Sequence, residues 1–281
     1  MQVQKYGEYN PYQKTEVQAV EFVERALLTR LNYLLGFLER YNAEVHQKYL
    51  EELTLKLETL VQENFVVQKV IDVFCFCGKY ENLKEQPELC ELVVNYGLGL
   101  LNLPNDVPWE SQKIEIAERD CLRGFLIGYY QLALALTEII DRKEAINLLK
   151  KQIDQFLHNN ARIPKIPDLE TARENFIEEA HEGGEVRIIS DVHDGKLILR
   201  KDTCQWADIM KETNDPELSY VVACYGDFKN CSERNENFVL TRNYTIMEGY
   251  PYCDEIIHDS RIVSNLKHPP KEFFDKLWPL E

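Results

Sequence analysis

The chain has 281 residues, of which 44% are hydrophobic and 28% charged, and its net charge is −16 at neutral pH. This length suits one large domain or two small ones with a substantial core. No apolar run reaches the roughly 18 residues that a membrane-spanning helix needs, and the N-terminus lacks the apolar segment of a secretory signal. We therefore expect an acidic, cytoplasmic protein.

The acidic character is concentrated in the C-terminal part of the chain. Residues 168–281 carry 24 acidic and 13 basic side chains, a net charge of −11. Such a surface repels phosphate backbones and anionic lipids, so nucleic acids and membranes are not expected partners. The partners that we expect are a small-molecule substrate or ligand, and a second copy of the chain as a candidate for a homodimer.

The first 160 residues show the three- and four-residue spacing of apolar side chains that is typical of amphipathic helices. The predicted helices cover about 16–41, 43–62, 64–77, 87–101, 110–139 and 142–158. Thr15 with Gln18, and Asp141 with Glu144, have the spacing of capping boxes. These two pairs therefore predict the starts of two helices.

Two glycines and two prolines punctuate this helical part. Gly124 and Gly128 lie four residues apart in one predicted helix, where they favour a close approach to a second helix. Pro164 and Pro167 mark a linker, which is followed by one more short helix.

Beyond residue 184 the apolar period changes to the alternation of β-strands. Asp194-Gly195 separates two alternating runs, EVRIISD and KLILRK, which predicts a hairpin. The other predicted elements are two short helices and two antiparallel strands, over about 203–210, 216–225, 237–249 and 253–259. The polar run 229–237 predicts a loop.

These elements predict an α+β protein with two portions. A helical portion over 1–160 is expected to pack on an antiparallel module with short helices over 168–281, and both portions are expected to share one core. The helices over 110–158 are long enough to cover one face of the sheet.

Three cysteines of the module each have an aspartate within three residues, and they are Cys204, Cys224 and Cys253. We expect these thiols and carboxylates to converge in one cleft under the final sheet. With His258 or Asp254 the three thiols could also supply four zinc ligands, but the C-x-x-C spacing of structural zinc sites is missing. We therefore expect neither a metal nor a cofactor.

Residues 119–259 resemble the L-2-amino-thiazoline-4-carboxylic acid hydrolase family. The pattern of that family has two strands, a cysteine that opens a helix, and a second cysteine that ends the next helix before an aspartate. It closes with a strand R-x-x-T-x-x-x-G and the sequence P-Y-C-D. The corresponding residues here are Cys204, Cys224, Asp227, Arg242 to Gly249 and Pro251 to Asp254. The ordered cysteines together with P-Y-C-D carry the resemblance.

The chain departs from the family pattern at three positions. Tyr250 stands where the family has an aspartate, and Glu255-Ile256 stand where it has phenylalanine and arginine. The missing arginine removes a planar, permanently charged partner for a substrate carboxylate. The module is more distantly similar to vinyl-reductase-type domains, which are ligand-binding or sensing modules.

The resemblance implies a hydrolase that acts on a carbon–nitrogen bond of a small cyclic amidine-like or thiazoline-carboxylate-like compound. On this hypothesis Cys224 or Cys253 is the nucleophile. Asp227 or Asp254 transfers protons. Arg242 holds a substrate carboxylate.

Other residues leave alternatives open. Cys204 either contacts the substrate or caps the helix that it opens, and Cys231 lies in the run that predicts a loop. His181, His193 and His258 are candidate bases among which the sequence does not choose. The alternative function is a non-catalytic small-ligand-binding or sensing protein.

Overall fold

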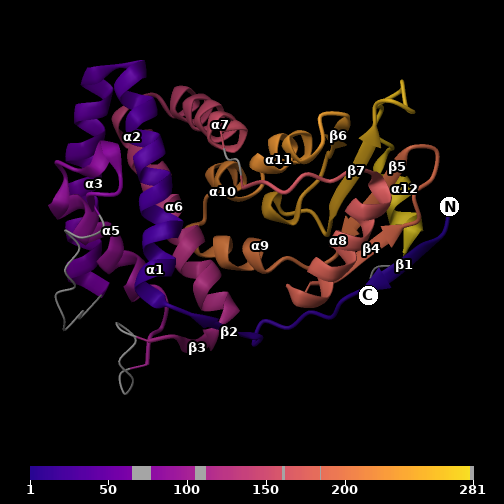
Figure 1. The fold of residues 1–281 in the computed structure, drawn as a ribbon, viewed down its shortest axis with the longest axis horizontal. Helices are drawn as coiled ribbons and strands as arrows, with labels where there is room; N and C mark the ends of the chain where they lie inside the picture. Colours follow the sequence, from indigo (N-terminus) through magenta and orange to yellow (C-terminus); the bar gives the residue numbers. More distant parts are fainter. Residues whose placement is uncertain (65–76, 105–111, 160–161, 184, 279–281) are drawn as a thin grey trace. The chain divides into compact units, whose positions relative to one another are not determined.

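The computed structural model describes residues 1–64, 77–104, 112–159, 162–183 and 185–278 (Figure 1). The chain divides into two compact units. The sheet unit comprises Met1–Pro11 and Ile153–Glu281, and the helical unit comprises Tyr12–Gln152. Within the described residues, no helix is both long and apolar enough to cross a membrane. The predicted α+β class, with a helical N-terminal part and an antiparallel C-terminal sheet, is confirmed.

The helical unit is built from helices and one pair of short strands. Its elements are β2 (Lys14–Val17), α1 (Ala19–Val23), the π-helical η1 (Glu24–Leu28), α2 (Thr29–Tyr41), α3 (Ala43–Asn64), the 3₁₀ turn η2 (Glu81–Leu83), α5 (Pro87–Gly99), β3 (Ile114–Ala117), α6 (Glu118–Ile139) and most of α7 (Arg142–His158). Leucines at helical spacing form its core, and Leu27, Leu31 and Leu35 are each at most 1% exposed.

One of the two predicted capping boxes is wrong. Thr15 lies in β2 opposite Ile116 of β3, and the helix begins at Ala19 without a cap from the Gln18 side chain. The spacing of Thr15 and Gln18 is that of a capping box, but Thr15 pairs with β3 instead. The local sequence does not reveal this pairing, because β3 lies about a hundred residues further along the chain. The cap at Asp141 is confirmed, since its Oδ1 accepts the backbone N–H of Glu144 at 3.1 Å.

The predicted close approach at the two glycines is confirmed. A Cβ at Gly124 would lie 2.6 Å from Leu101 Cδ2, and one at Gly128 would lie 2.7 Å from Leu27 Cδ1. The helix predicted from residue 110 begins at Glu118, because residues 114–117 form β3. The helix predicted over 64–77 falls almost wholly on 65–76, outside the described residues.

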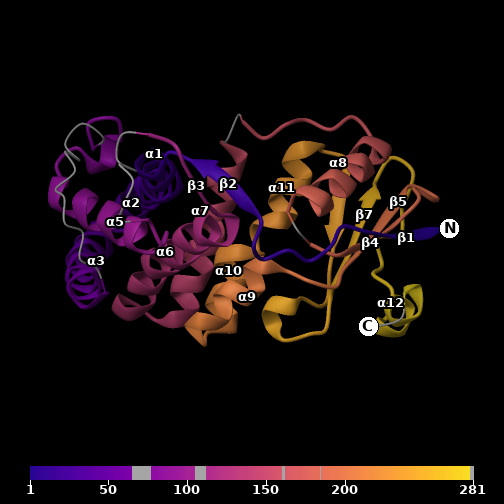
Figure 2. The same ribbon diagram turned by 90° about the horizontal axis from the view of Figure 1, so that it is seen from below.

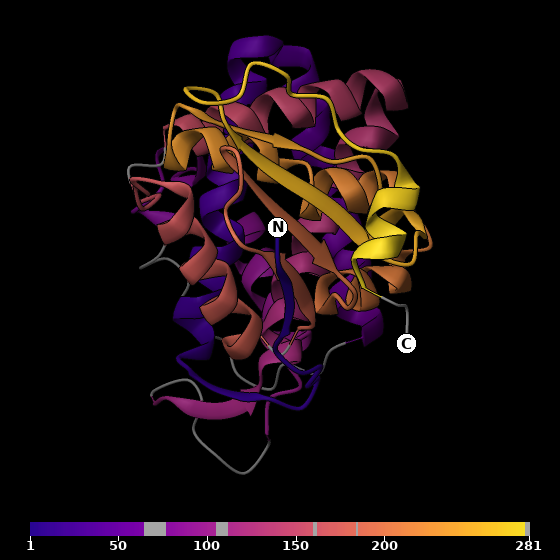
Figure 3. The ribbon, with the colours of Figure 1, turned by 90° about the vertical axis from the view of Figure 1, so that its right-hand side faces the viewer.

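The sheet unit contains five antiparallel strands in the order β1-β4-β5-β7-β6. They are β1 (Val3–Tyr6), β4 (Arg187–Ser190), β5 (Lys196–Lys201), β7 (Cys253–Asp259) and β6 (Phe238–Thr241). Figure 3 shows the N-terminal strand at the edge of the sheet beside β4. All seven residues of β7, which lies between β5 and β6, are buried.

Helices cover both faces of this sheet. They are α8 (Leu169–Glu182) and α11 (Gly226–Arg234) on one face and α12 (Lys271–Leu277) on the other. The unit also contains α9 (Gln205–Met210), η3 (Lys211–Thr213), α10 (Pro216–Ala223) and η4 (Ile246–Glu248). On the α8 face, Leu197, Leu199 and Ile257 pack with residues of α8 and α11. On the α12 face, Ile198 and Ile256 pack with Phe274. Figure 2 shows α8 and α12 on opposite sides of the strands.

Two elements of the sheet unit differ from the prediction. Residues 226–234 form α11, although the sequence predicts a loop over 229–237. The strand predicted over 237–249 is paired only at Phe238–Thr241, because the chain then turns through η4. The predicted hairpin, with Gly195 at its turn, is confirmed.

Two glycines with positive φ allow the cost of backbone strain to be compared with the cost of a steric clash. Gly249 has φ +91, and a Cβ added there would meet no atom within 4 Å, whereas a Cβ at Gly7, with φ +73, would lie 2.1 Å from Glu185 O. We expect Gly249→Ala to lower the free energy of unfolding by about 1 kcal/mol and Gly7→Ala by about 2–5 kcal/mol. Urea unfolding of both variants measures the difference, and equal losses would contradict it.

Candidate functional site

Strand alternation decides which face of the sheet each candidate side chain occupies. In β7, Cys253 and Glu255 lie on the α8 face and Asp254 lies on the α12 face. Lys201 pairs with Cys253, and Arg200 pairs with Asp254. The structure therefore divides the predicted neighbours Cys253 and Asp254 between opposite faces.

A buried charge cluster lies on the α8 face and consists of Lys201, Asp227, Arg242 and Glu255. Arg242 Nη1 donates to Asp227 Oδ2 at 2.7 Å and to Glu255 Oε1 at 3.2 Å. Lys201 Nζ lies 3.2 Å from the same Glu255 oxygen. The Arg242 and Glu255 side chains are 2% and 5% exposed, whereas that of Asp227 is 42% exposed. Two bases face two acids, so the cluster is neutral overall.

Arg242 is engaged by protein groups on both terminal nitrogens. Its Nη2 donates to Cys224 O at 2.8 Å and to the Tyr220 hydroxyl at 3.4 Å. Burial alone would lower the pKa of Arg242, but Glu255 and Asp227 raise it. The guanidinium thus ties the end of α10 and the start of α11 to β7. This leaves its Nη atoms poorly placed for the predicted contact with a substrate carboxylate.

The two carboxyl groups of the charge cluster have pKa values displaced in opposite directions. Burial raises the pKa of Asp227, although Arg242 and Lys201 act to lower it. Water offsets part of this rise because the side chain is partly exposed. Burial also opposes the ionisation of Glu255, but Lys201 and Arg242 bring its pKa below the ordinary value. Asp227 is therefore the carboxyl group better suited to gain and lose a proton.

The three predicted cysteines approach the charge cluster from different elements. Cys204 precedes α9, Cys224 follows α10, and Cys253 begins β7. Their charges would interact, since a thiolate at Cys253 raises the pKa of both other thiols. Burial raises the pKa of Cys204 to about 12, that of Cys253 to about 11, and that of Cys224 well above its ordinary value. All three are therefore protonated at neutral pH.

Two of these sulfur atoms accept backbone hydrogen bonds. Cys204 Sγ accepts the N–H of Ala207 at 3.4 Å, which confirms the capping role at the start of α9. Cys253 Sγ accepts the N–H of Ile246 at 3.3 Å and thereby holds the start of η4. Both thiols thus have a structural role whatever else they do.

A cavity of about 130 Å³ adjoins the charge cluster on the α8 face. Its lining residues are Ile166, Ala172, Phe176, Glu179, Lys201, Asp227, Asn230, Cys231, Arg234, Phe238, Leu240, Glu255 and Ile257. Asp227, Asn230, Cys231 and Arg234 follow the i, i+3, i+4, i+7 spacing of one helix stripe, so α11 forms one wall. The three predicted cysteines are not among these lining residues, whereas Cys231 is.

None of the three candidate histidine bases is among the residues that line this cavity. His181 lies in α8 with its ring 6.4 Å from that of Tyr6. His193 is 57% exposed in the hairpin turn, and His258 lies on the α12 face. The carboxyl groups among its lining residues are those of Glu179, Asp227 and Glu255.

On the α12 face, Asp254 acts as a buried hydrogen-bond acceptor. Its Oδ1 accepts the backbone N–H groups of Asn243 at 2.9 Å and Tyr244 at 2.7 Å. Its Oδ2 lies 2.9 Å from His268 Nε2. The carboxylate thus fixes the chain after β6 and the segment before α12.

A chain of hydrogen bonds continues from Asp254 to His258. His268 Nδ1 lies 2.9 Å from Thr241 Oγ1. Thr241 Oγ1 in turn lies 3.0 Å from His258 Nε2. The remaining His258 Nδ1 is buried without a partner among the described residues. A proton added there has no acceptor.

No group of three or more His, Cys, Asp or Glu side chains in the described part of the chain is arranged to hold a metal ion. The four-ligand set considered from the sequence is also split by the sheet. Cys253 faces α8, and both Asp254 and His258 lie on the α12 face.

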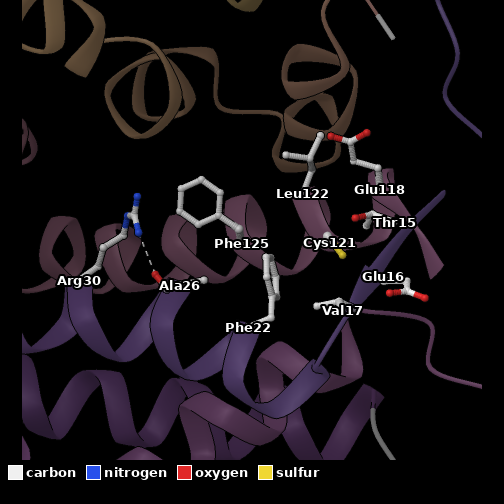
Figure 4. A pocket seen from close by; sticks show the side chains of 10 residues that line it. All are labelled: Thr15, Glu16, Val17, Phe22, Ala26, Arg30, Glu118, Cys121, Leu122 and Phe125. Carbon is white, nitrogen blue, oxygen red and sulfur yellow. Dashed lines mark hydrogen bonds between the residues drawn. The ribbon is translucent and has the colours of Figure 1, made fainter. Parts of the chain in front are cut away.

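A second, larger cavity of about 320 Å³ lies within the helical unit. Figure 4 shows its apolar walls, which include Phe22, Leu122 and Phe125. The Arg30 guanidinium stacks on the Phe125 ring, with Cζ 4.3 Å from the centroid, and Nη1 donates to Ala26 O at 3.0 Å. This cavity is mainly an apolar groove.

The comparison with protein families distinguishes the two cavities. Residues 129–256 match the family described as L-2-amino-thiazoline-4-carboxylic acid hydrolase, which confirms the predicted resemblance over this segment. The matched segment contains the charge cluster and every lining residue of the sheet-unit cavity except Ile257. It contains none of the residues that line the larger cavity. No curated protein and no solved structure matches the chain.

Five polar cavity residues were missed by the sequence reasoning, and they are Glu179, Lys201, Asn230, Arg234 and Glu255. For Lys201 and Glu255 a signal exists. In the alternating pattern of their strands they belong to the same face as the apolar residues Leu199 and Ile257. A charge at such a position predicts a buried polar contact. Asn230 and Arg234 carry no such signal, because their helix is not predicted.

The buried His258 predicts a pH dependence of stability. Burial, then Lys196 and His268, lower its pKa from 6.5 to about 4. As pH falls from 6.5 to 4, the unfolded chain takes up this proton first, so the free energy of unfolding falls. His258→Gln should remove that part of the loss between about pH 7 and pH 5 in urea unfolding. His193→Gln, at the exposed turn, is the control, and a His258→Gln profile parallel to wild type would refute the assignment.

Proposed function

We propose that the sheet-unit cavity is an active site that hydrolyses a carbon–nitrogen bond of a small cyclic amidine of thiazoline-carboxylate type. The supporting observation is that the charge cluster adjoins a cavity within the segment that matches the hydrolase family. A cavity of roughly 150 Å³ accommodates benzene. The volume of about 130 Å³ is slightly smaller and therefore limits the ligand to a single small ring.

Asp227 is the proposed acid–base residue. Hydrolysis adds water to the amidine carbon, which requires removal of a proton from water and delivery of a proton to the leaving nitrogen. Asp227 lines the cavity, is partly exposed, and has a raised pKa. In its ionised form it can take the proton from water and then return it to the nitrogen. Ionised Glu255 provides negative charge beside a cationic amidine.

Cys224 and Cys253 are the alternative nucleophiles in this proposal. Their raised pKa values disfavour a thiolate, and neither lines the cavity. Both observations favour attack by water that Asp227 activates. Cys253 is better placed than Cys224 for a thiol route, because it pairs across the strands with Lys201.

The departures from the family pattern have a different meaning once the faces are known. Ile256, at the position of the family's arginine, packs with Ile198 and Phe274 on the α12 face. The replacement of the family's arginine by Ile256 therefore lies outside the cavity and does not remove a substrate partner from it. Glu255, at the position of the family's phenylalanine, is the departure that adds a carboxylate to the cavity wall.

The alternative function is a non-catalytic small-ligand-binding or sensing protein. The observation that favours it is the internal pairing of the charge cluster, in which Glu255 accepts from both Arg242 and Lys201. Such pairing can serve a rigid binding wall without any proton transfer.

Turnover of L-2-amino-thiazoline-4-carboxylate tests the proposal. We expect the full chain to form a ring-opened product heavier by one water molecule, detected by mass spectrometry. Asp227→Asn should lower kcat at least about 100-fold, because proton transfer is lost. Asp194→Asn, at a turn side chain that is 85% exposed, is the matched control and should retain wild-type turnover.

Serine variants separate the two chemical routes. Cys224→Ser and Cys253→Ser should keep kcat within about tenfold of wild type if water is the nucleophile. Loss of turnover in Cys253→Ser, with Asp227→Asn still active, would show that the Cys253 thiol is the nucleophile. Absence of turnover by the wild-type chain would remove the hydrolase proposal for this substrate and leave the ligand-binding alternative.

A further inference from the structure

The two cations that line the cavity differ in how closely protein carboxylates approach them. Lys201 Nζ lies 3.2 Å from Glu255 Oε1. Arg234 Nη1 approaches its carboxylate, Glu179 Oε1, only to 3.8 Å. The other Glu179 oxygen already accepts from Arg187 Nη1 at 2.9 Å. Arg234 is therefore the more weakly neutralised cation of the cavity.

Arg234 also has unused hydrogen-bonding capacity. Its Nε atom is buried and has no hydrogen-bond partner within the described residues. A buried N–H group without an acceptor is unfavourable, and an oxygen atom from a bound molecule would satisfy it. Asn230 lines the cavity one helical turn earlier, so its side-chain amide can donate to the same oxygen atoms.

We infer that Arg234 and Asn230 form the subsite for a carboxylate group of the molecule that the cavity takes. The guanidinium presents Nε–H and Nη–H side by side, which matches the two oxygen atoms of a carboxylate. The inference rests on the proposed function for the kind of ligand, and it adds the ligand's orientation. It also assigns to Arg234 the role that the sequence suggested for Arg242.

The stripe of α11 fixes that orientation. Asp227 and Arg234 are seven residues apart, so the helical rise separates them by about 10 Å. This spacing leaves room for one small ring between the carboxylate and the guanidinium. The cationic amidine then lies at Asp227, the carboxylate lies at Arg234, and the ring contacts the apolar wall of Leu240 and Ile257. The bond to be hydrolysed is thereby placed at the Asp227 end.

Two probes that differ only in the carboxylate test this subsite. They are L-2-amino-thiazoline-4-carboxylate and 2-amino-thiazoline, titrated into the full chain by calorimetry. We expect wild type to bind the carboxylate probe at least about tenfold more tightly than the other. Arg234→Met should weaken binding of the carboxylate probe about 10–100-fold, because charge-assisted hydrogen bonds are lost, and leave the other probe within about twofold.

Further variants control for charge and for folding. Arg234→Lys keeps the charge but loses the planar donor pair, so its affinity for the carboxylate probe should be intermediate. Arg261→Met removes a cation that is 50% exposed and bound to Asp259 outside the cavity. It should bind both probes as wild type does. Urea unfolding midpoints identify any variant that fails to fold. If Arg234→Met does not fold, the affinity of Arg234→Lys for the carboxylate probe tests the subsite by itself.

The outcomes separate this inference from the proposed function. Unchanged affinity of Arg234→Met for the carboxylate probe overturns the subsite, even if wild type hydrolyses that probe. Failure of wild type to prefer the carboxylate probe, or to bind either probe, overturns it as well. A preference that Arg234→Met abolishes, without turnover in wild type, supports the subsite and contradicts the hydrolase proposal.

Discussion

The sheet unit depends on neutralising the carboxylate of Glu255 in β7, whose side chain is 5% exposed. Breaking a buried ion pair costs about 3–5 kcal/mol. The cationic side chains that pair with this carboxylate are therefore held in place. Lys201 approaches it from β5, and Arg242 approaches it from the end of β6. Arg242 also binds Asp227, which fixes the start of α11. The requirement for charge balance thus positions the helix that forms one wall of the cavity.

The alternation of the same two strands builds a second polar network on the α12 face. Arg200 is fully buried and donates to both oxygens of Asp202, at 2.6 and 2.8 Å, and to Phe274 O at 2.9 Å. Asp254 binds His268 on the same face. These groups attach α12 to the sheet and use their hydrogen-bonding capacity within the protein. On the α8 face, Arg234 retains a buried donor without an acceptor among the described residues, and this donor adjoins the cavity. Alternation thus sorts neighbouring residues into a structural face and a cavity face.

The sequence predicts those elements whose signals are local. The hairpin at Gly195 and the strand from Cys253 are examples, because a turn residue and an alternation of period two determine them. Helix α11 is missed because GDFKNCSER has only two apolar side chains, Phe228 and Cys231, and burial of Cys231 against the sheet stabilises it. The region of the site is also predictable from its cysteines and aspartates. The division of Cys253 from Asp254 requires the strand register, which the sequence alone does not give.

The charge balance of the cavity bears on the kind of ligand that it can hold. The charge cluster that adjoins the cavity is neutral overall, so a ligand with a net charge would leave an uncompensated charge beside it. A free anion would also approach a segment whose net charge is −11, which slows its association. A zwitterion avoids both costs, because its cationic end faces Asp227 while its carboxylate faces Arg234. The electrostatics of the cavity therefore favour a small molecule that carries an amidine and a carboxylate together over one that carries either group alone.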